Sequence, residues 1–238
     1  NGKNLMMILP ALFFLGLGFK PEFWTGGLYG FSALFVVPSL LFKAVVARVK
    51  PDDTPIRLLD DSKLPVYTIL LPLHREANIV TRLFDHLLKL DYPRSKLQII
   101  LLIEEADKAT QAAIKSSTNF SHFETIICPD GLPKTKPRAL AIGQFYARGE
   151  FIVVFDAEDF PEPQQLRKAA TVFMRSSPRL GCVQAALAIY NRKDSWLSRL
   201  FSLEYAVLFD VILPGMAHLG MPIPLGGTSN HLRRNVLT

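Results

Sequence analysis

Acidic side chains gather directly behind three short apolar segments of the sequence, residues 66–71, 98–103 and 151–155. Together with one histidine, the residues concerned are His74, Glu76, Glu104, Glu105, Asp156, Glu158 and Asp159. Clustered anions repel one another unless a cation or hydrogen-bond donors compensate them. Because oxygen ligands suit hard divalent ions, the cluster predicts a site for Mg²⁺ or Mn²⁺. One such acid alone could simply begin a helix, where it favours the helix dipole, so the prediction depends on all three groups together.

A basic segment lies between the second and third acidic groups. It runs Gly-Leu-Pro-Lys-Thr-Lys-Pro-Arg over residues 131–138 and therefore carries Lys134, Lys136 and Arg138. Cations beside a helix N-terminus can hold phosphate, and Pro137 suits the first turn of a helix. Taken alone, the segment is more simply a solvated basic loop. A diphosphate held by a divalent ion on one side and by Lys and Arg on the other would use both groups, which predicts a nucleoside diphosphate site.

Apolar runs alternate with amphipathic stretches from residue 65 onward, which predicts an α/β domain. The expected strands are residues 66–71, 98–103, 125–128, 151–155 and 182–187, and the expected helices are residues 76–89, 108–116, 138–148, 164–174 and 195–213. Continuously apolar runs are typical of strands buried on both faces of a mostly parallel, doubly wound sheet. Such sheets bind ligands at the carboxyl ends of their strands, where the acidic groups fall.

The apolar character is greatest near the N-terminus. Residues 5–19 contain no charge and residues 28–47 contain only Lys43, which predicts two transmembrane segments joined by a turn over residues 20–27. Two buried core helices, or a signal peptide in residues 1–19, are the alternatives. Basic residues flank the outer ends of this hairpin more than its turn, which favours a cytoplasmic location for the rest of the chain. The polar residues 51–64 are interpreted as a linker.

The overall composition indicates a folded domain attached to a membrane. Of the 238 residues, 49% are hydrophobic and 20% are charged, with a mean hydropathy of +0.22, which excludes a disordered chain. The net charge of +6 suits anionic lipids or a small anionic substrate, whereas nucleic-acid binding is not expected without a dense run of Lys and Arg. Cys128 and Cys182 lie in apolar stretches and are expected to be reduced core residues.

Five motifs within residues 65–238 resemble those of bacterial membrane-bound family 2 glycosyltransferases of the cellulose-synthase-like kind. They are LPLHREANI (71–79), IILLIEE (99–105), TKPRAL (135–140), FDAEDFPEP (155–163) and GGTSNHLRR (226–234). The resemblance implies a GT-A fold and an inverting transfer of a sugar from a UDP- or GDP-sugar, with UDP preferred and Mg²⁺ or Mn²⁺ as cofactor. The implied partners are the nucleotide-sugar donor, a growing polysaccharide or lipid-linked acceptor, and membrane lipids. The implied location is the bacterial inner membrane, with the catalytic domain in the cytoplasm.

The resemblance also implies roles for individual residues. The implied substrate-binding set is His74, Glu76, Glu104, Glu105, Lys136, Arg138 and Asp156. His74 and Glu76, with either Glu104 or Glu105, would hold the base and the ribose, and the two basic residues would lie near the nucleotide. Asp156 and Glu158 stand where the family has its Asp-x-Asp pair, which binds the ribose and the metal on the diphosphate. Asp159 is an alternative second metal ligand, because the tetrapeptide can be aligned with either carboxylate.

The sequence departs from the family pattern at two places. Ala141 stands where relatives often have Asn. In addition, the family's catalytic base lies in a Thr-Glu-Asp motif after the Gly-Gly-Thr segment, and a Gln-x-x-Arg-Trp motif that grips the acceptor lies further on. The base is therefore expected beyond Thr238, and these residues alone are expected to be an inactive fragment, incomplete at the C-terminus. A non-catalytic nucleotide-sugar-binding or scaffolding domain is the alternative function.

Overall fold

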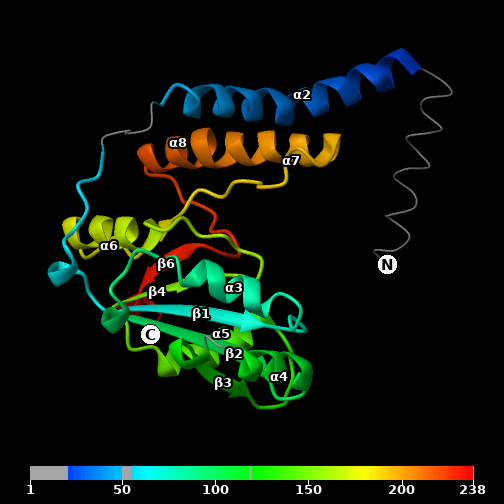
Figure 1. Cartoon of the computed structure of the whole chain (residues 1–238). Helices are drawn as coiled ribbons and strands as arrows, with labels where there is room; N and C mark the ends of the chain where they lie inside the picture. Colours follow the sequence, from blue (N-terminus) through cyan, green and yellow to red (C-terminus); the bar gives the residue numbers. More distant parts are fainter. Residues whose placement is uncertain (1–20, 50–54, 118–119, 238) are drawn as a thin grey trace. The chain divides into compact units, whose positions relative to one another are not determined.

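The computed structural model of the chain describes residues 21–49, 55–117 and 120–237, which divide into two compact units (Figure 1). One unit contains residues 55–187 and 224–237 and carries the sheet. The other contains residues 21–49 and 188–223 and is helical. The predicted domain over residues 65–238 therefore includes a helical segment that belongs to the second unit.

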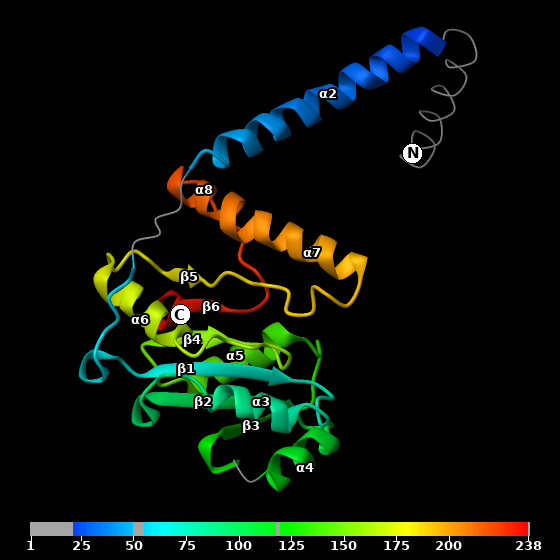
Figure 2. The same ribbon diagram turned by 45° about the horizontal axis from the view of Figure 1, so that its top comes forward.

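The described strands form one sheet with the order β3-β2-β1-β4-β6-β5 (Figure 2), in which five strands run in the same direction and β6 alone runs antiparallel to its neighbours β4 and β5. The strands are β1 (Tyr67–Leu73), β2 (Leu97–Glu104), β3 (Glu124–Cys128), β4 (Phe151–Val154), β5 (Cys182–Gln184) and β6 (Asn230–Arg233). The expected α/β class with a mostly parallel sheet is confirmed, and each expected strand lies within a few residues of an observed one. β6 is not among the expected strands, because Asn-His-Leu-Arg is not a continuous apolar run.

The strand register brings three strand ends to one edge of the sheet. Tyr67, the first residue of β1, is opposite Leu97 of β2 and Phe151 of β4, and all three strands run parallel. The segments that follow β1, β2 and β4 therefore leave the sheet at the same edge, where ligands bind in α/β folds.

Four helices flank the sheet, and they are α3 (Val80–Leu87), α4 (Lys108–Ser116), α5 (Lys136–Tyr146) and α6 (Gln165–Arg175). α4 has the predicted bounds, and α5 has Pro137 in its first turn as expected. The predicted start of a helix at Glu76 is wrong, since α3 begins only at Val80. The backbone N–H groups of Arg75 and Glu76 are hydrogen-bonded to side chains of the next strand–helix segment, and a separate turn precedes the helix.

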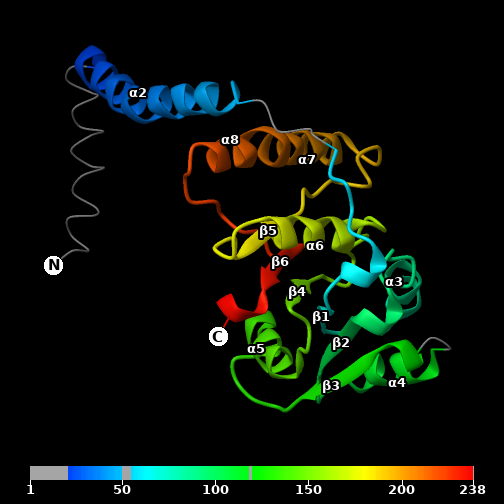
Figure 3. The same cartoon turned by 90° about the vertical axis from the view of Figure 1, so that its left-hand side faces the viewer.

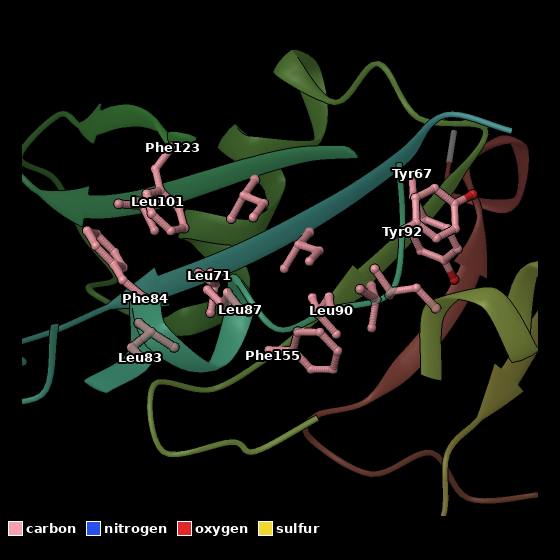
Figure 4. Close-up of a cluster of buried hydrophobic side chains, with 14 of the residues drawn as sticks. Tyr67, Leu71, Leu83, Phe84, Leu87, Leu90, Tyr92, Leu101, Phe123 and Phe155 are labelled. Carbon is pink, nitrogen blue, oxygen red and sulfur yellow. The ribbon is translucent and has the colours of Figure 1, made fainter. Parts of the chain in front are cut away.

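Both faces of the sheet are buried. Ile69 and Leu71 of β1 belong to the larger core cluster, which α3, α4 and α6 cover, whereas Leu70 belongs to a smaller cluster against α5. Figure 3 shows α5 and α3 on opposite sides of β1 and β2. In the larger cluster the rings of Phe84 and Phe123 stack with centroids 3.9 Å apart (Figure 4). Burial on both faces explains why the central strands are continuously apolar.

A buried polar group ties β6 to the rest of the sheet. His231 is 1% exposed, with Nδ1 2.6 Å from Tyr67 Oη and Nε2 3.1 Å from Gln165 Nε2. Burial lowers the pKa of His231 to about 4, because the interior disfavours the charged imidazolium. The imidazole is therefore neutral in the folded chain at pH 7 and serves as a structural hydrogen-bonding group.

Short 3₁₀ helices occur in the connecting segments, at Asp61–Lys63, Arg94–Lys96, Phe120–His122 and Arg234–Val236. The first of them falls in the predicted linker over residues 51–64. There the carboxylate of Asp61 lies 2.7 Å from the guanidinium of Arg167 in α6. This described part of the linker is therefore attached to the α/β unit.

The helical unit contains two long apolar helices. α2 spans Pro21–Val46, and α7 (Trp196–Ala206) continues through a π-helical stretch, Val207–Ile212, into α8 (Leu213–His218). α2 and α8 approach closely at Gly215, where a Cβ atom would lie 2.7 Å from Val46. Two stretches of these helices are long and apolar enough to cross a membrane, with mean hydropathies of 1.7 and 1.6.

The N-terminal predictions are corrected in one respect. The predicted turn over residues 20–27 is wrong in its described part, because α2 already begins at Pro21. Proline is tolerated in the first turn of a helix, and a Cβ atom at Gly26 or Gly27 would meet no other atom within 4 Å, so neither glycine serves a close contact or a turn. The predicted transmembrane segment over residues 28–47 coincides with most of α2. The segment over residues 5–19 lies outside the described residues, so the hairpin stays a prediction.

We predict that His231 makes the free energy of unfolding depend on pH. Above the unfolded-state pKa of 6.5, the His231 side chain is neutral in both the folded and the unfolded chain. At lower pH the unfolded chain binds a proton on this side chain, whereas the folded chain does not. Stability should therefore fall by about 3 kcal/mol between pH 6.5 and about 4, since one pKa unit corresponds to about 1.4 kcal/mol. Urea unfolding of wild type and His231→Gln over this range measures the effect. A stability difference between the two that does not change with pH would contradict it.

Candidate functional site

A cavity of about 400 Å³ opens at the carboxyl ends of β1, β2 and β4. The ionisable residues that line it are His74, Glu76, Glu104, Lys134, Lys136, Asp156 and Glu158. The structure thus brings together residues from all three acidic groups and from the basic segment between them. Glu105, Arg138 and Asp159 are not part of the lining.

The segment that carries His74 and Glu76 is fixed from the neighbouring strand–helix connection. The N–H of Arg75 donates to Asp107 Oδ2 at 2.6 Å, and the N–H of Glu76 donates to Thr110 Oγ1 at 3.0 Å. Asp107 also caps α4, because its Oδ1 accepts from the N–H of Thr110 at 3.2 Å. Arg75 has a φ of 60°, a left-handed conformation that is rare for a residue with a side chain. These contacts orient the segment toward the cavity.

The carboxyl of Glu76 is placed against other acids. Desolvation contributes most to raising the pKa of Glu76, and the nearby negative charge of Glu158 raises it further. Glu76 and Glu158 come from the ends of β1 and β4, so this effect arises only because the register brings the two ends together. A cation that entered the cavity would lower the cost of ionising both groups.

Glu104, which lines the cavity, forms an incompletely satisfied pair with Arg138, which does not. Arg138 Nη1 lies 3.8 Å from Glu104 Oε2, and within the described residues both atoms are buried without a hydrogen-bond partner. The guanidinium is held in place by its other nitrogen, since Nη2 donates to the Pro129 carbonyl at 2.6 Å. Buried polar atoms without partners are costly, so this pair indicates a place for ligand groups that supply the missing hydrogen bonds.

Glu105 and Asp130 lie beside this pair but outside the cavity lining. The Glu105 carboxylate is exposed and accepts from the N–H of Asp130 at 3.2 Å. Asp130 in turn pairs with Lys134 at 2.6 Å. Of the two adjacent glutamates predicted at the end of β2, Glu104 is therefore the one that faces the cavity.

The acidic segment after β4 has its own basic partner. Lys136 Nζ lies 2.5 Å from Asp156 Oδ1 and donates to the Gly227 carbonyl at 2.6 Å. Glu158 is exposed, whereas Asp159 is partly buried, and desolvation contributes most to raising the pKa of Asp159. Asp159 Oδ2 accepts from the N–H of Asp156 at 2.7 Å and from the hydroxyl of Thr228.

The residues present fit a divalent ion that arrives with its substrate. No group of three or more His, Cys, Asp and Glu side chains that could hold a metal occurs in the described part of the chain. Mg²⁺ in phosphate-binding sites is commonly held by one or two carboxylates together with the phosphates. Asp156 and Glu158 supply two carboxylates in one cavity that Lys134 and Lys136 also line, which matches that arrangement.

Two contacts of the site were not predicted from the sequence. Asp107 with Thr110 three residues later is a typical helix N-cap pattern, so the cap could have been found, although not its bond to Arg75. The bond between Thr228 and Asp159 joins residues 69 positions apart. No local pattern in the sequence predicts this bond.

The model of the family described as glycosyltransferase like family 2 matches residues 65–238, which is most of the chain. The chain belongs to glycosyltransferase family 2. The family that the five motifs resemble is thereby confirmed at this level. The match includes the segments that follow β1, β2 and β4 and therefore the whole cavity lining.

Two curated relatives are similar to this family 2 chain. The probable glycosyltransferase YdaM of Bacillus subtilis (strain 168) is 24% identical over 178 residues, which cover 74% of this chain and 42% of YdaM. An N-acetylglucosaminyltransferase of Rhizobium meliloti (strain 1021) is 25% identical over 167 residues, which cover 67% of this chain and 38% of the relative. The chain thus matches only about two fifths of the length of either relative.

A solved structure supports the expected fold of this family 2 chain. The mannosyltransferase PcManGT from Pyrobaculum calidifontis, in complex with GDP-Man and Mn²⁺, superposes with a TM-score of 0.64 at 20% identity. The superposition covers 88% of this chain and 56% of the mannosyltransferase. The α/β architecture is therefore GT-A-like.

We predict that Asp107→Ala lowers the free energy of unfolding by about 1 kcal/mol, the usual cost of losing a helix cap. It should also increase amide hydrogen exchange over residues 74–79, because the N–H of Arg75 loses its acceptor. Asp107→Asn should keep both properties near wild type, since Asn caps helices equally well. Urea unfolding and hydrogen exchange with mass spectrometry provide the measurements. Equal effects in the control Lys108→Ala, an exposed position in the same turn, would count against this role of Asp107.

Proposed function

We propose that this chain forms the donor-binding part of a membrane-bound, inverting glycosyltransferase of the cellulose-synthase-like kind. The donor is a nucleoside diphosphate sugar, with UDP as the nucleotide, and the acceptor is a growing polysaccharide or a lipid-linked sugar. The observation that carries the proposal is the charge composition of the cavity, whose lining includes the acids Asp156 and Glu158 together with Lys134 and Lys136. A diphosphate with its counter-ion has the complementary arrangement.

The diphosphate end of the site has residues for both charges. Lys136 sits beside the N-terminus of α5, where cations and helix N–H groups favour phosphate. Asp156 and Glu158 would hold Mg²⁺ or Mn²⁺, which when bound neutralises charge on the diphosphate leaving group. Lys136 already balances the charge of Asp156 before a donor arrives, whereas the negative charges of Glu76 and Glu158 remain close to each other.

The nucleoside end is assigned to the walls formed by β1 and β2. Glu104 has an unpartnered buried oxygen that can accept an N–H of the base, and Arg138 has an unpartnered nitrogen next to it. His74 and Glu76 line the same cavity and can bond ribose hydroxyls. Glu105, which is exposed beside the cavity, has at most a peripheral role in nucleoside binding.

Transfer with inversion also requires a carboxylate that deprotonates the acceptor hydroxyl as it attacks the anomeric carbon. We assign that role to no residue of this chain, because the cavity carboxylates are occupied with the donor.

Membrane attachment is assigned to the helical unit. Along α2 the apolar side chains are exposed, with Tyr29 74% and Leu34 67% exposed. Trp196 and Leu203 of α7 are 75% and 62% exposed. Apolar surface of this extent on two long helices suits a lipid environment. We place the protein in the bacterial inner membrane with the α/β unit in the cytoplasm.

We predict metal-dependent binding of UDP that requires Asp156. Calorimetric titration of UDP into the detergent-solubilised chain should give binding with Mn²⁺ and at least tenfold weaker binding with EDTA. Asp156→Ala should remove the Mn²⁺-dependent part, while the control Asp85→Ala, an exposed acid on α3, should leave it unchanged. A parallel titration with GDP decides the preferred base. Binding that is indifferent to Mn²⁺ or to Asp156 would overturn the proposed donor site, and UDP binding without sugar transfer by the whole protein would favour the non-catalytic alternative.

We predict that Lys136 acts on the phosphates and not on the nucleoside. Lys136→Met should weaken UDP binding about tenfold or more and leave the much weaker binding of uridine within a factor of two. The control Lys89→Met removes an exposed charge away from the cavity and should affect neither ligand. Equal losses for UDP and uridine in Lys136→Met would instead assign the lysine to the nucleoside or to folding.

A further inference from the structure

The three carboxylates of the segment after β4 differ in their surroundings. Asp156 and Glu158 line the cavity, whereas Asp159 does not. One oxygen of Asp159 accepts two hydrogen bonds, from the N–H of Asp156 at 2.7 Å and from the hydroxyl of Thr228. Resting on the donor site proposed above, we propose that Asp159 is a positioning residue that fixes Asp156 for the metal–diphosphate group and is not itself a metal ligand.

Reciprocal hydrogen bonds between Asp156 and Asp159 form a turn within this segment. Besides the bond from the Asp156 N–H to the Asp159 carboxylate, the N–H of Asp159 donates to the Asp156 carbonyl at 3.1 Å. The two residues therefore hold each other from both sides over a tight turn. Since Phe155 immediately before them is fully buried, the turn starts from a fixed point at the end of β4.

Thr228 attaches this turn to a distant part of the chain. It belongs to the Gly-Gly-Thr-Ser segment, and the next residue, Ser229, donates its N–H to the Val154 carbonyl at 2.8 Å. Ser229 has a φ of 57°, so the chain bends sharply here before β6 pairs with β4. The hydroxyl of Thr228 is consequently held beside Asp159, and a bond from a hydroxyl to an ionised carboxylate is among the stronger hydrogen bonds.

A second contact joins the acidic turn to the Gly-Gly-Thr-Ser segment. Lys136 Nζ connects Asp156 Oδ1 with the Gly227 carbonyl, one residue before Thr228. The Gly227–Thr228 pair thus contacts Asp156 through Lys136, which lines the cavity, and through Asp159, which does not. If Lys136 turns toward phosphate, the Asp159–Thr228 bond still joins the acidic turn directly to the Gly227–Thr228 pair. A ligand role for the bonded Asp159 oxygen would require breaking both of its hydrogen bonds.

The two roles predict opposite behaviour of matched variants. For a positioning residue the acceptor oxygen and the hydroxyl matter, so Asp159→Ala and Thr228→Val should each weaken Mn²⁺-dependent UDP binding about tenfold. The double variant should lose little more, because the two changes break the same bond. Asp159→Asn keeps the acceptor oxygen and Thr228→Ser keeps the hydroxyl, so both should stay within about threefold of wild type. Calorimetry with UDP, and electron paramagnetic resonance of free Mn²⁺ in the presence of UDP, give two independent readouts.

A metal-ligand role would show the reverse pattern and would overturn the proposal. Asp159→Asn would then lose Mn²⁺ as completely as Asp159→Ala, and Thr228→Val would bind Mn²⁺ like wild type. Failure of wild type to bind UDP with Mn²⁺ would refute the donor site itself. Amide hydrogen exchange over residues 154–160 in the unliganded chain separates these cases. It should rise in Thr228→Val and not in Thr228→Ser, and unchanged exchange in both would also overturn the proposal.

Discussion

Repulsion among the carboxylates at the ends of β1, β2 and β4 is the constraint on which the organisation of the site depends. The parallel register forces these acids to one edge of the sheet, and three of them have partners from other parts of the chain. Lys136 forms an ion pair with Asp156, and Arg138 lies beside Glu104. Asp159 accepts hydrogen bonds from Thr228 and from the backbone of its own turn. The surplus of negative charge around Glu76 and Glu158 remains for something that enters the cavity.

Much of this architecture could be predicted from the sequence, because the physical cause of each element is local. Continuous apolar runs identified the strands, and Pro137 marked the first turn of α5. The parts that could not be predicted depend on distant residues. α3 starts late because the N–H groups of Arg75 and Glu76 bond to side chains beyond β2. β6 has no continuous apolar run because strand pairing and the hydrogen bonds of the buried His231 stabilise it instead. The strand ends were enough to predict which residues converge on the cavity. They were not enough to predict which carboxylates line it, because that depends on tertiary contacts.

The fold and the chemistry of the chain have different support. Membership of family 2 and the GT-A-like fold rest on a match over residues 65–238 and on a superposition at 20% identity. The donor chemistry rests on particular side chains of this structure, above all on Asp156, Lys136 and Glu104 and their partners. An α/β scaffold offers its strand ends to many reactions, so the reaction class is argued from those side chains and not from the scaffold.

The place of β6 in the chain has a consequence for biosynthesis. Strand β5 ends at Gln184, yet its partner β6 begins only at Asn230, and the helical segment 188–223 is synthesised between them. Thr228, which completes the acidic turn, therefore leaves the ribosome only after that apolar helix. During translation β1 to β4 and the residues that line the cavity can fold early, but β6 and the contacts of Gly227 and Thr228 with the acidic turn must wait. A nascent chain acquires a finished donor pocket only once the helical insertion has been accommodated.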